Sequence, residues 1–179
     1  MKRVDLMGCG LGFDHSPDFS APHERWALNS LMFMRYSGDF DGWTRWFDLH
    51  STAHIQRQRP KAYDWYRTQT KPIYRWEPDP ALPSSVAYPL AAIQTAFPGE
   101  TDFSCSVSWM LALALLEGFD DIHLFWFQMM HEYTTTQVPS VRYWIGRARG
   151  MGVTVEIHGE SDLTPAGPLY GLHTMELTV

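Results

Sequence analysis

Two pairs of side chains in this sequence have the types and the spacing that acid–base chemistry needs. His131 and Glu132 are neighbours in the polar segment QMMHEYTTTQVPS, and imidazole and carboxyl groups can both be tuned to titrate near neutral pH. Asp48 and His50 end the β-prone stretch WTRWFDLH, so their side chains point to the same side of a strand. The carboxylate either raises the basicity of the imidazole, or the pair holds a ribose hydroxyl. The alternative interpretation of the first pair is a solvated loop.

A glycine loop follows the first predicted strand. Gly8, Gly10 and Gly12 in LMGCGLG allow backbone amides to approach a phosphate group. The G-x-G-x-G spacing is shorter than the full dinucleotide fingerprint, and Asp14 would repel a phosphate. A tight turn without a ligand is therefore an equally good interpretation.

A third candidate site opens the segment FSCSVSWMLALALL. Ser104 and Ser106 precede a run that is apolar on every side, which is typical of a buried helix. The hydroxyls and amides of its first turn either cap the helix or receive a phosphate or carboxylate. Tyr133, in the polar segment near His131, is the candidate for stacking on a nucleobase.

The spacing of the metal-ligating residue types predicts no metal site. His50 and His54 have the i, i+4 spacing of a helical metal pair, but a third ligand is missing. Cys9 and Cys105 lack metal-binding spacing and fit a reducing compartment. His123 lies inside a predicted strand, which indicates a core histidine with satisfied hydrogen bonds.

The elements that must position these residues alternate along the chain. Hydrophobic periodicity and turn residues predict strands over 3–7, 43–50, 71–76, 121–127 and 153–157, and helices over 20–35, 60–70, 88–97, 106–117 and about 141–148. Such alternation predicts an α/β fold, a Rossmann-like three-layer sandwich with a mainly parallel sheet, in a single domain over residues 1–179. Ligands of such sheets bind beyond the carboxyl ends of the strands.

Charge and hydropathy exclude several function classes. The 179 residues carry 14 Lys and Arg against 20 Asp and Glu, a net charge of −6, which argues against broad nucleic-acid binding. The longest near-apolar run, residues 107–116, is too short to span a bilayer, and Asp5 interrupts the start as a signal peptide. We therefore expect a cytoplasmic protein that does not act at a membrane.

Several segments carry a family resemblance. The series LMGCGLG, ERWALN, WFDLH, SCSVSWMLALALLEGFDDIHLF and WIGRARGMGVTV resembles phage and bacterial proteins grouped near the archaeal hydroxymethylpterin diphosphokinase. That group is similar in fold to the bacterial sialyltransferases, which bind a nucleotide-sugar donor on a Rossmann-like sheet. The resemblance covers about residues 4–161.

The resemblance implies a nucleotide-binding domain and assigns roles by matched position. It implies a donor loop at Gly8, Gly10 and Gly12, an asparagine of the donor helix at Asn29, a pair after the second strand at Asp48 and His50, and a serine-led turn at Ser104 and Ser106. Where relatives carry Gly and then Asp after the fourth strand, this chain has Trp126 and Gln128, which removes an acidic group.

Three functions follow as expectations. The first choice is a nucleotide-binding transferase, glycosyltransferase-like, that uses a nucleotide-sugar donor, with His131 or Glu132 as base. The second is an ATP-dependent diphosphotransferase, which would need Mg²⁺ held by carboxylates such as Asp48 and Glu132. The third is a non-catalytic protein that sequesters a nucleotide, which Gln128 favours.

Overall fold

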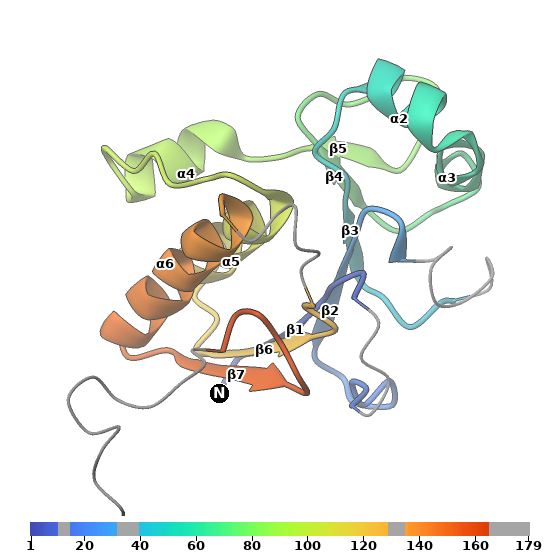
Figure 1. Ribbon diagram of the computed structural model, residues 1–179. Helices are drawn as coiled ribbons and strands as arrows, with labels where there is room; N and C mark the ends of the chain where they lie inside the picture. Colours follow the sequence, from blue (N-terminus) through green and yellow to red (C-terminus); the bar gives the residue numbers. More distant parts are fainter. Residues whose placement is uncertain (11–14, 32–39, 129–134, 165–179) are drawn as a thin grey trace, which may run out of the picture.

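The computed structural model of this chain describes residues 1–10, 15–31, 40–128 and 135–164 (Figure 1). Its centre is a sheet of seven strands in the order β5-β4-β3-β2-β1-β6-β7, and every neighbouring pair is parallel. The strands are β1 (Arg3–Met7), β2 (Glu24–Leu28), β3 (Arg45–Phe47), β4 (Ile73–Arg75), β5 (Ser85–Ala87), β6 (Asp121–Phe125) and β7 (Thr154–His158). The predicted α/β fold with a parallel sheet is confirmed.

Strand β2 corrects the helix that the sequence predicted from Ser20 onward. Trp26 and Leu28 are buried in one hydrophobic cluster, whereas Ala27 between them is buried in the other. A segment buried between two strands, β1 and β3, must place alternate side chains on opposite faces of the sheet, so the period is two. The hydroxyl of Ser20 donates to Asp18 at 2.6 Å instead of capping a helix.

Helices cover both faces of the sheet (Figure 1). One face carries α4 (Leu90–Ala96), α5 (Ser106–Leu116) and α6 (Gln137–Gly150), and the other carries α2 (Thr52–Gln58) and α3 (Pro60–Tyr66). Helix α2 and strand β5 were not predicted from the sequence, because each offers only a short hydrophobic pattern. The layers agree with the expected three-layer sandwich.

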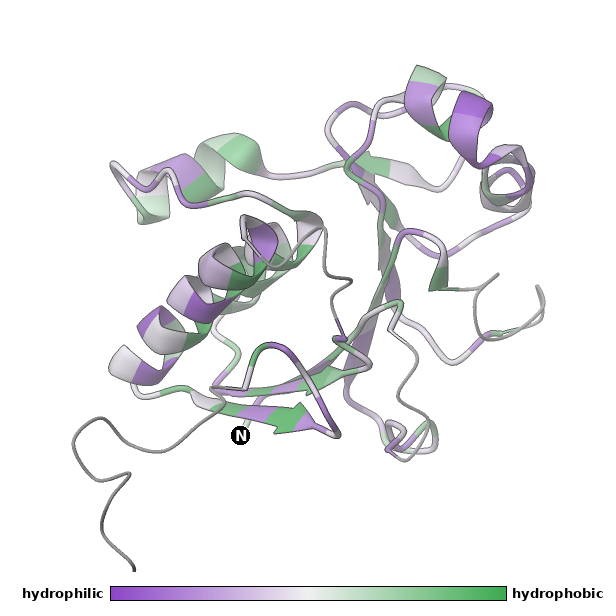
Figure 2. Ribbon diagram, in the orientation of Figure 1, coloured by the Kyte–Doolittle hydropathy of each residue, from purple (hydrophilic) through white to green (hydrophobic). Residues whose placement is uncertain are grey.

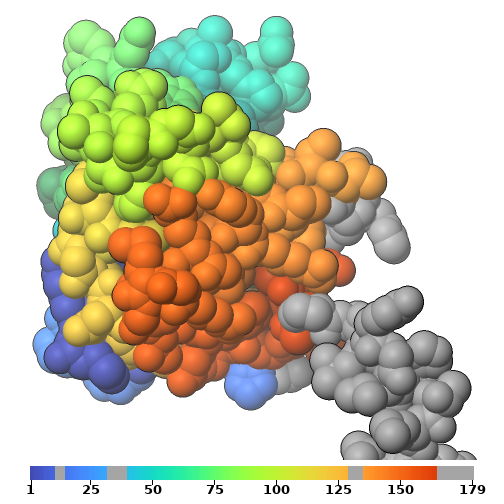
Figure 3. Space-filling model, turned by 90° about the vertical axis from the view of Figure 1, so that its left-hand side faces the viewer, coloured from blue at the N-terminus to red at the C-terminus, as the bar shows by residue number. Residues whose placement is uncertain are grey.

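Helix α5 is the central helix of its layer. Val107, Met110, Leu111 and Leu113 are all at most 4% exposed, as the apolar run predicted. Helix α6 lies over it and, with α4, forms the outer surface in Figure 3. Gly118, with φ of +72°, ends α5 where other residues would be strained. The body of the helix in the segment FSCSVSWMLALALL is therefore core.

The outer helices have one buried face each. On α6 the buried residues Val141, Trp144 and Ala148 belong to the same core cluster as α5, and hydrophilic positions alternate with them along the helix (Figure 2). Within the described residues, no helix combines the length and the apolar character that crossing a bilayer requires.

Candidate functional site

The carboxyl ends of β1, β2, β3 and β4 lie side by side, and a continuous set of contacts joins the loops that follow them. Cys9 after β1 lies with its Sγ 3.4 Å from the carbonyl oxygen of Leu28, at the end of β2. Tyr66 connects the carbonyl oxygen of Asn29, at 3.0 Å, to the carboxylate of Asp48 after β3, at 2.7 Å. These loops define the candidate site, which we call the carboxyl-edge site.

The glycine loop approaches the end of β6 very closely. The amides of Gly8 and Gly10 donate to the carbonyl oxygens of Phe125 and Trp126 at 2.8 and 2.7 Å. A Cβ on Gly8 would lie 2.5 Å from the Trp126 oxygen, and one on Gly10 would lie 2.6 Å from the Gln128 nitrogen. These two glycines therefore allow backbone contact, and their amides are engaged within the protein.

Asn29 follows β2 directly, so its predicted place on a helix is wrong. Its backbone lies in the left-handed region, with φ of +48°, which asparagine tolerates better than most residues. Its amide donates to the carbonyl oxygen of Phe47 at 2.9 Å. Its side-chain Oδ1 is buried and has no hydrogen-bond partner in the described part of the chain. Such an atom is costly unless something binds it.

Asp48 is the most enclosed acidic group of the carboxyl-edge site. Its side chain is fully buried and accepts hydrogen bonds from Tyr66 at 2.7 Å and from Arg59 at 3.1 Å. Burial alone would raise the pKa of this carboxyl group, but the His50 hydrogen bond and the charge of Arg59 outweigh it and lower the pKa. Burial and the Asp48 charge raise the pKa of Tyr66, which therefore stays a donor.

Asp48 also orients His50. The Nδ1 atom of His50 lies 2.8 Å from Oδ1 of Asp48 and 2.9 Å from Nη2 of Arg59. One nitrogen cannot donate to the carboxylate and also accept from the guanidinium, so we assign the proton on Nδ1, donated to Asp48. In that tautomer Nε2 keeps its lone pair, on a side chain that is 40% exposed. The expected pairing of Asp48 with His50 is thus present in the structure, after the third strand of the sequence.

His54 lies on α2 and stacks on His50, with ring centres 4.8 Å apart. Burial and the neighbouring positive charges lower the pKa of His54. Its contact with His50 is therefore between rings, and the described residues bring no third metal-ligating side chain to this pair.

Ser104 and Ser106 lie at the start of α5, whose N-cap is Cys105. The hydroxyl of Ser104 donates to the carbonyl oxygen of Thr136 at 2.9 Å, which ties this turn to the start of α6. Among the described residues, the side chain of Cys105 makes no capping hydrogen bond to α5. Of the two interpretations of these serines, capping is not found among the described hydrogen bonds, and binding of a phosphate or carboxylate stays a prediction. The first amides of α5 carry the partial positive charge of a helix N-terminus.

Arg59 and Arg75 are site residues that the sequence did not single out. Arg75 ends β4 and is 2% exposed. Its Nη2 donates to the carbonyl oxygen of His50 at 3.3 Å and to Thr52 at 2.9 Å, whereas Nε and Nη1 have no partner among the described residues. The signal that could have found Arg75 is a cation at the carboxyl end of an otherwise apolar strand, in KPIYRW.

Four predicted site residues lie outside the described residues. These are Gly12, His131, Glu132 and Tyr133. Their roles stay predictions.

The comparison with known proteins finds solved structures of similar fold. No protein-family model matches the sequence, and no curated protein matches it. Two solved structures of the sialyltransferase CstII from Campylobacter jejuni are similar in fold. The structure in complex with cytidine-5'-monophosphate matches with a TM-score of 0.50 and 14% identity, over 88% of this chain and 79% of the other. The structure in complex with CMP-3FNeuAc matches with a TM-score of 0.52 and 12% identity, over 88% and 80%.

At such low identity the similarity concerns the fold alone. The resemblance of the sequence to the archaeal hydroxymethylpterin diphosphokinase group and to phage proteins stays a prediction. The carboxyl-edge site therefore stands on a sheet and helix arrangement similar to that of a bacterial sialyltransferase.

Proposed function

We propose that this chain is a nucleotide-binding transferase of the glycosyltransferase type, which takes a nucleotide sugar as donor at the carboxyl-edge site. Two features support the proposal. The fold is similar to that of a sialyltransferase solved with CMP and with a CMP-sugar analogue. Asn29, Asp48 and His50 lie at the strand ends where parallel sheets bind their ligands, and Tyr66 joins the carbonyl oxygen of Asn29 to the carboxylate of Asp48.

The observation that carries the proposal is the state of Asn29. A non-glycine residue in the left-handed region and a buried amide oxygen without a partner both cost free energy. Strained residues of this kind cluster at ligand-binding sites. An Asn Oδ1 accepts hydrogen bonds from amino or hydroxyl groups, which a nucleotide and its sugar both carry.

His50 is the group that would accept the acceptor's proton. In glycosyl transfer the bond between the sugar carbon and the donor phosphate breaks, and its electron pair leaves with the phosphate. An acceptor oxygen bonds to that carbon, and its proton passes to a base. Asp48 holds the Nδ1 proton of His50, so Nε2 is the lone pair that serves as this base. His131 and Glu132 are the alternative bases.

Two groups would supply positive charge to the donor phosphate. The uncapped start of α5, with Ser104 and Ser106, presents helix amides. Arg75 contributes a buried guanidinium with two unpaired donor atoms behind the His50 backbone. The amides of Gly8 and Gly10 are already engaged, so the glycine loop would contact the donor through its other atoms.

The two alternative functions, a diphosphotransferase and a sequestering protein, are not equally well supported. A diphosphotransferase would need carboxylates for Mg²⁺, yet the oxygens of Asp48 already accept from Tyr66, Arg59 and His50. The sequestering protein is favoured by Gln128, which stands where the related group has an acid. It is therefore the stronger of the two alternatives.

The deciding experiment measures ligand binding by calorimetry, with CMP, CMP-sugars, UDP-sugars and ATP, each with and without Mg²⁺. We expect one CMP- or UDP-type donor to bind without a requirement for Mg²⁺. Selective binding of ATP with Mg²⁺ would support the diphosphotransferase instead. If no nucleotide binds, the proposed donor site is wrong.

Variants then separate binding from turnover. We expect Asn29→Ala to weaken donor binding about tenfold or more, the loss of roughly one good hydrogen bond. His50→Gln should keep donor binding and lower the rate of donor hydrolysis or transfer at least 100-fold. The matched control, His54→Gln, should change neither quantity. Donor binding in the wild type without turnover on any acceptor would point to the sequestering protein.

A further inference from the structure

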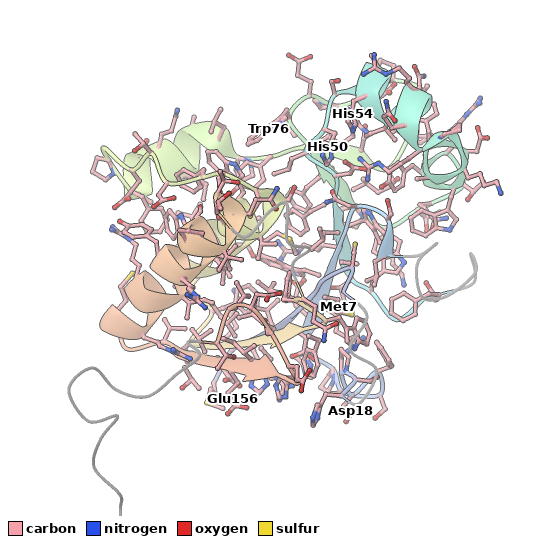
Figure 4. The ribbon with its side chains drawn as sticks, in the orientation of Figure 1. Met7, Asp18, His50, His54, Trp76 and Glu156 are labelled. Carbon is pink, nitrogen blue, oxygen red and sulfur yellow. The ribbon has the colours of Figure 1, made fainter. Side chains whose placement is uncertain are left out.

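A second cluster of ionisable side chains lies on the sheet face opposite α5 and α6. The side chains of Asp121, His123 and Phe125 alternate onto this face along β6, and those of Thr154, Glu156 and His158 do so along β7. The parallel register places His123 beside Glu156 and Phe125 beside His158. In Figure 4, Glu156 lies far from His50 and His54, so this cluster is separate from the carboxyl-edge site.

Three potential ligand atoms of this cluster converge on one point. Nδ1 of His123 lies 2.7 Å from Nε2 of His158, and the same Oε2 of Glu156 lies 3.7 and 3.8 Å from these two nitrogens. A triangle with these sides has its centre about 2.0 Å from each corner, which is the length of a bond from zinc to imidazole nitrogen or carboxylate oxygen. The three atoms are therefore spaced as ligands of one ion.

The surroundings orient both imidazoles toward that point. Nε2 of His123 lies 3.1 Å from the buried carboxylate of Asp121, which holds the proton on Nε2 and leaves the Nδ1 lone pair directed at the cluster. A carboxylate behind a histidine is the usual support of a metal ligand. The ring of His158 stacks on Phe125, with centres 4.1 Å apart and planes 1° apart.

Without an ion, a single proton must lie between the two facing nitrogens. A metal ion would replace that proton and would also neutralise Glu156, which no Lys or Arg of the described residues pairs. Asp5, on the neighbouring strand β1, is already paired with Arg3 and His23 and does not compete for the ion. The cluster thus has acceptor atoms in excess, as a cation site requires.

We propose that His123, Glu156 and His158 bind a divalent transition-metal ion of the zinc type. Two imidazole nitrogens and one carboxylate favour Zn²⁺ or Co²⁺ over Mg²⁺ and Ca²⁺, which prefer oxygen ligands. Glu156 is 55% exposed, so water reaches the ion and completes the tetrahedron. The ion joins the edge strand β7 to β6, and its binding stabilises the folded chain.

The test uses the full chain without a polyhistidine tag, treated with chelator and then titrated with Zn²⁺ in a calorimeter and with Co²⁺ in a spectrophotometer. We expect one ion per chain and the intense visible absorption of tetrahedral Co²⁺, unchanged by millimolar Mg²⁺. The melting temperature should rise on addition of Zn²⁺. Failure to bind Zn²⁺ would overturn the proposal.

Variants locate the ion. Glu156→Gln should weaken Zn²⁺ binding at least tenfold, and His158→Gln more, while both melt like the wild type in the absence of metal. Asp121→Asn, which changes a positioning residue, should weaken binding 10- to 100-fold and shift the Co²⁺ spectrum. The control His54→Gln should bind as the wild type does. Wild-type affinity in Glu156→Gln and His158→Gln would show that the ion binds elsewhere and would overturn the assignment.

Discussion

Two of the places where the described residues bring a histidine to a carboxylate differ in the balance of hydrogen-bond donors and acceptors. At the carboxyl-edge site, Asp48 is fully buried and receives hydrogen bonds from Tyr66, Arg59 and His50. On the sheet face opposite α5 and α6, the imidazoles of His123 and His158 face each other and the half-exposed Glu156. At the carboxyl-edge site, hydrogen-bond donors satisfy the carboxylate of Asp48. In the second cluster, the imidazole nitrogens and the Glu156 carboxylate present lone pairs that a cation could bind.

The surroundings of each carboxylate decide which chemistry it can support. A buried carboxylate surrounded by donors stays ionised and fixes the tautomer of its histidine, so it supports proton transfer. An exposed carboxylate beside two imidazole lone pairs is free to bind an ion. Histidine and a carboxylate therefore form a proposed general base at the carboxyl-edge site and a proposed metal site on β6 and β7.

Among the variants that test this difference, Asp48→Asn is expected to change the free energy of unfolding most. The change leaves the guanidinium of Arg59 without its buried counter-charge, so we expect the free energy of unfolding to fall by about 3 kcal/mol. Glu156→Gln, the matched change at the exposed carboxylate, should cost less than about 0.5 kcal/mol in metal-free protein. Urea unfolding of both variants at pH 7 measures the difference. Equal losses would mean that the two carboxylates have the same environment.

The next largest effect on the free energy of unfolding is expected at Gly10, whose backbone lies close to the end of β6. Gly10→Ala would place a Cβ 2.6 Å from the backbone of Trp126 and of Gln128, so we expect a loss of about 1–3 kcal/mol in unfolding free energy. The control is Gly146→Ala on α6, where nothing lies within 4 Å of an added Cβ. It should stabilise the helix by about 0.5–1 kcal/mol. A tolerated Gly10→Ala would contradict the contact with the end of β6.

A smaller effect appears in the pH dependence of stability. The pKa of Asp48 is lower in the folded chain than its ordinary value of 3.8, so on acidification the unfolded chain takes up this proton first. The stabilisation is complete well above pH 3.8 and is lost as pH falls toward the folded pKa. The stability gap between wild type and Asp48→Asn should thus shrink as pH falls from 5 to 3. A gap that stays constant over this range would argue against the lowered pKa.

The smallest effect is expected for His54→Gln. The ring of His54, on α2, stacks on His50, and among the described residues its side chain has no buried hydrogen-bond partner. We therefore expect the free energy of unfolding to change by less than about 0.5 kcal/mol. Thermal unfolding measures this value. A larger loss would mean that the stacked pair is part of the core of the site.

Much of the fold could be predicted because long or strongly patterned segments carry their own signal. The all-apolar run of α5 and the strand before Trp126 were identified from hydrophobicity and the glycine at residue 118. Strand β2 was missed because Ser20, Pro22 and spaced leucines imitate a helix start, and burial between two strands decided otherwise. Asp48 and His50 were found because their spacing is local.

Arg59, Tyr66 and Arg75 could not be found in this way. Their roles depend on where α3 and β4 lie relative to the end of β3, which involves contacts between residues up to 25 positions apart. Patterns in a sequence report the neighbours along the chain and not those across the sheet.

Local patterns account for most of the strands and helices, for the loops that carry polar residues, and for the closeness of Asp48 and His50 just after β3. These follow from periods of two and 3.6 residues, which are properties of the local backbone. The contact of His123 with His158 and Glu156 depends on the tertiary structure, because strand order and register bring together residues 33 and 35 positions apart. Register is set by packing of whole faces, and no local pattern encodes it.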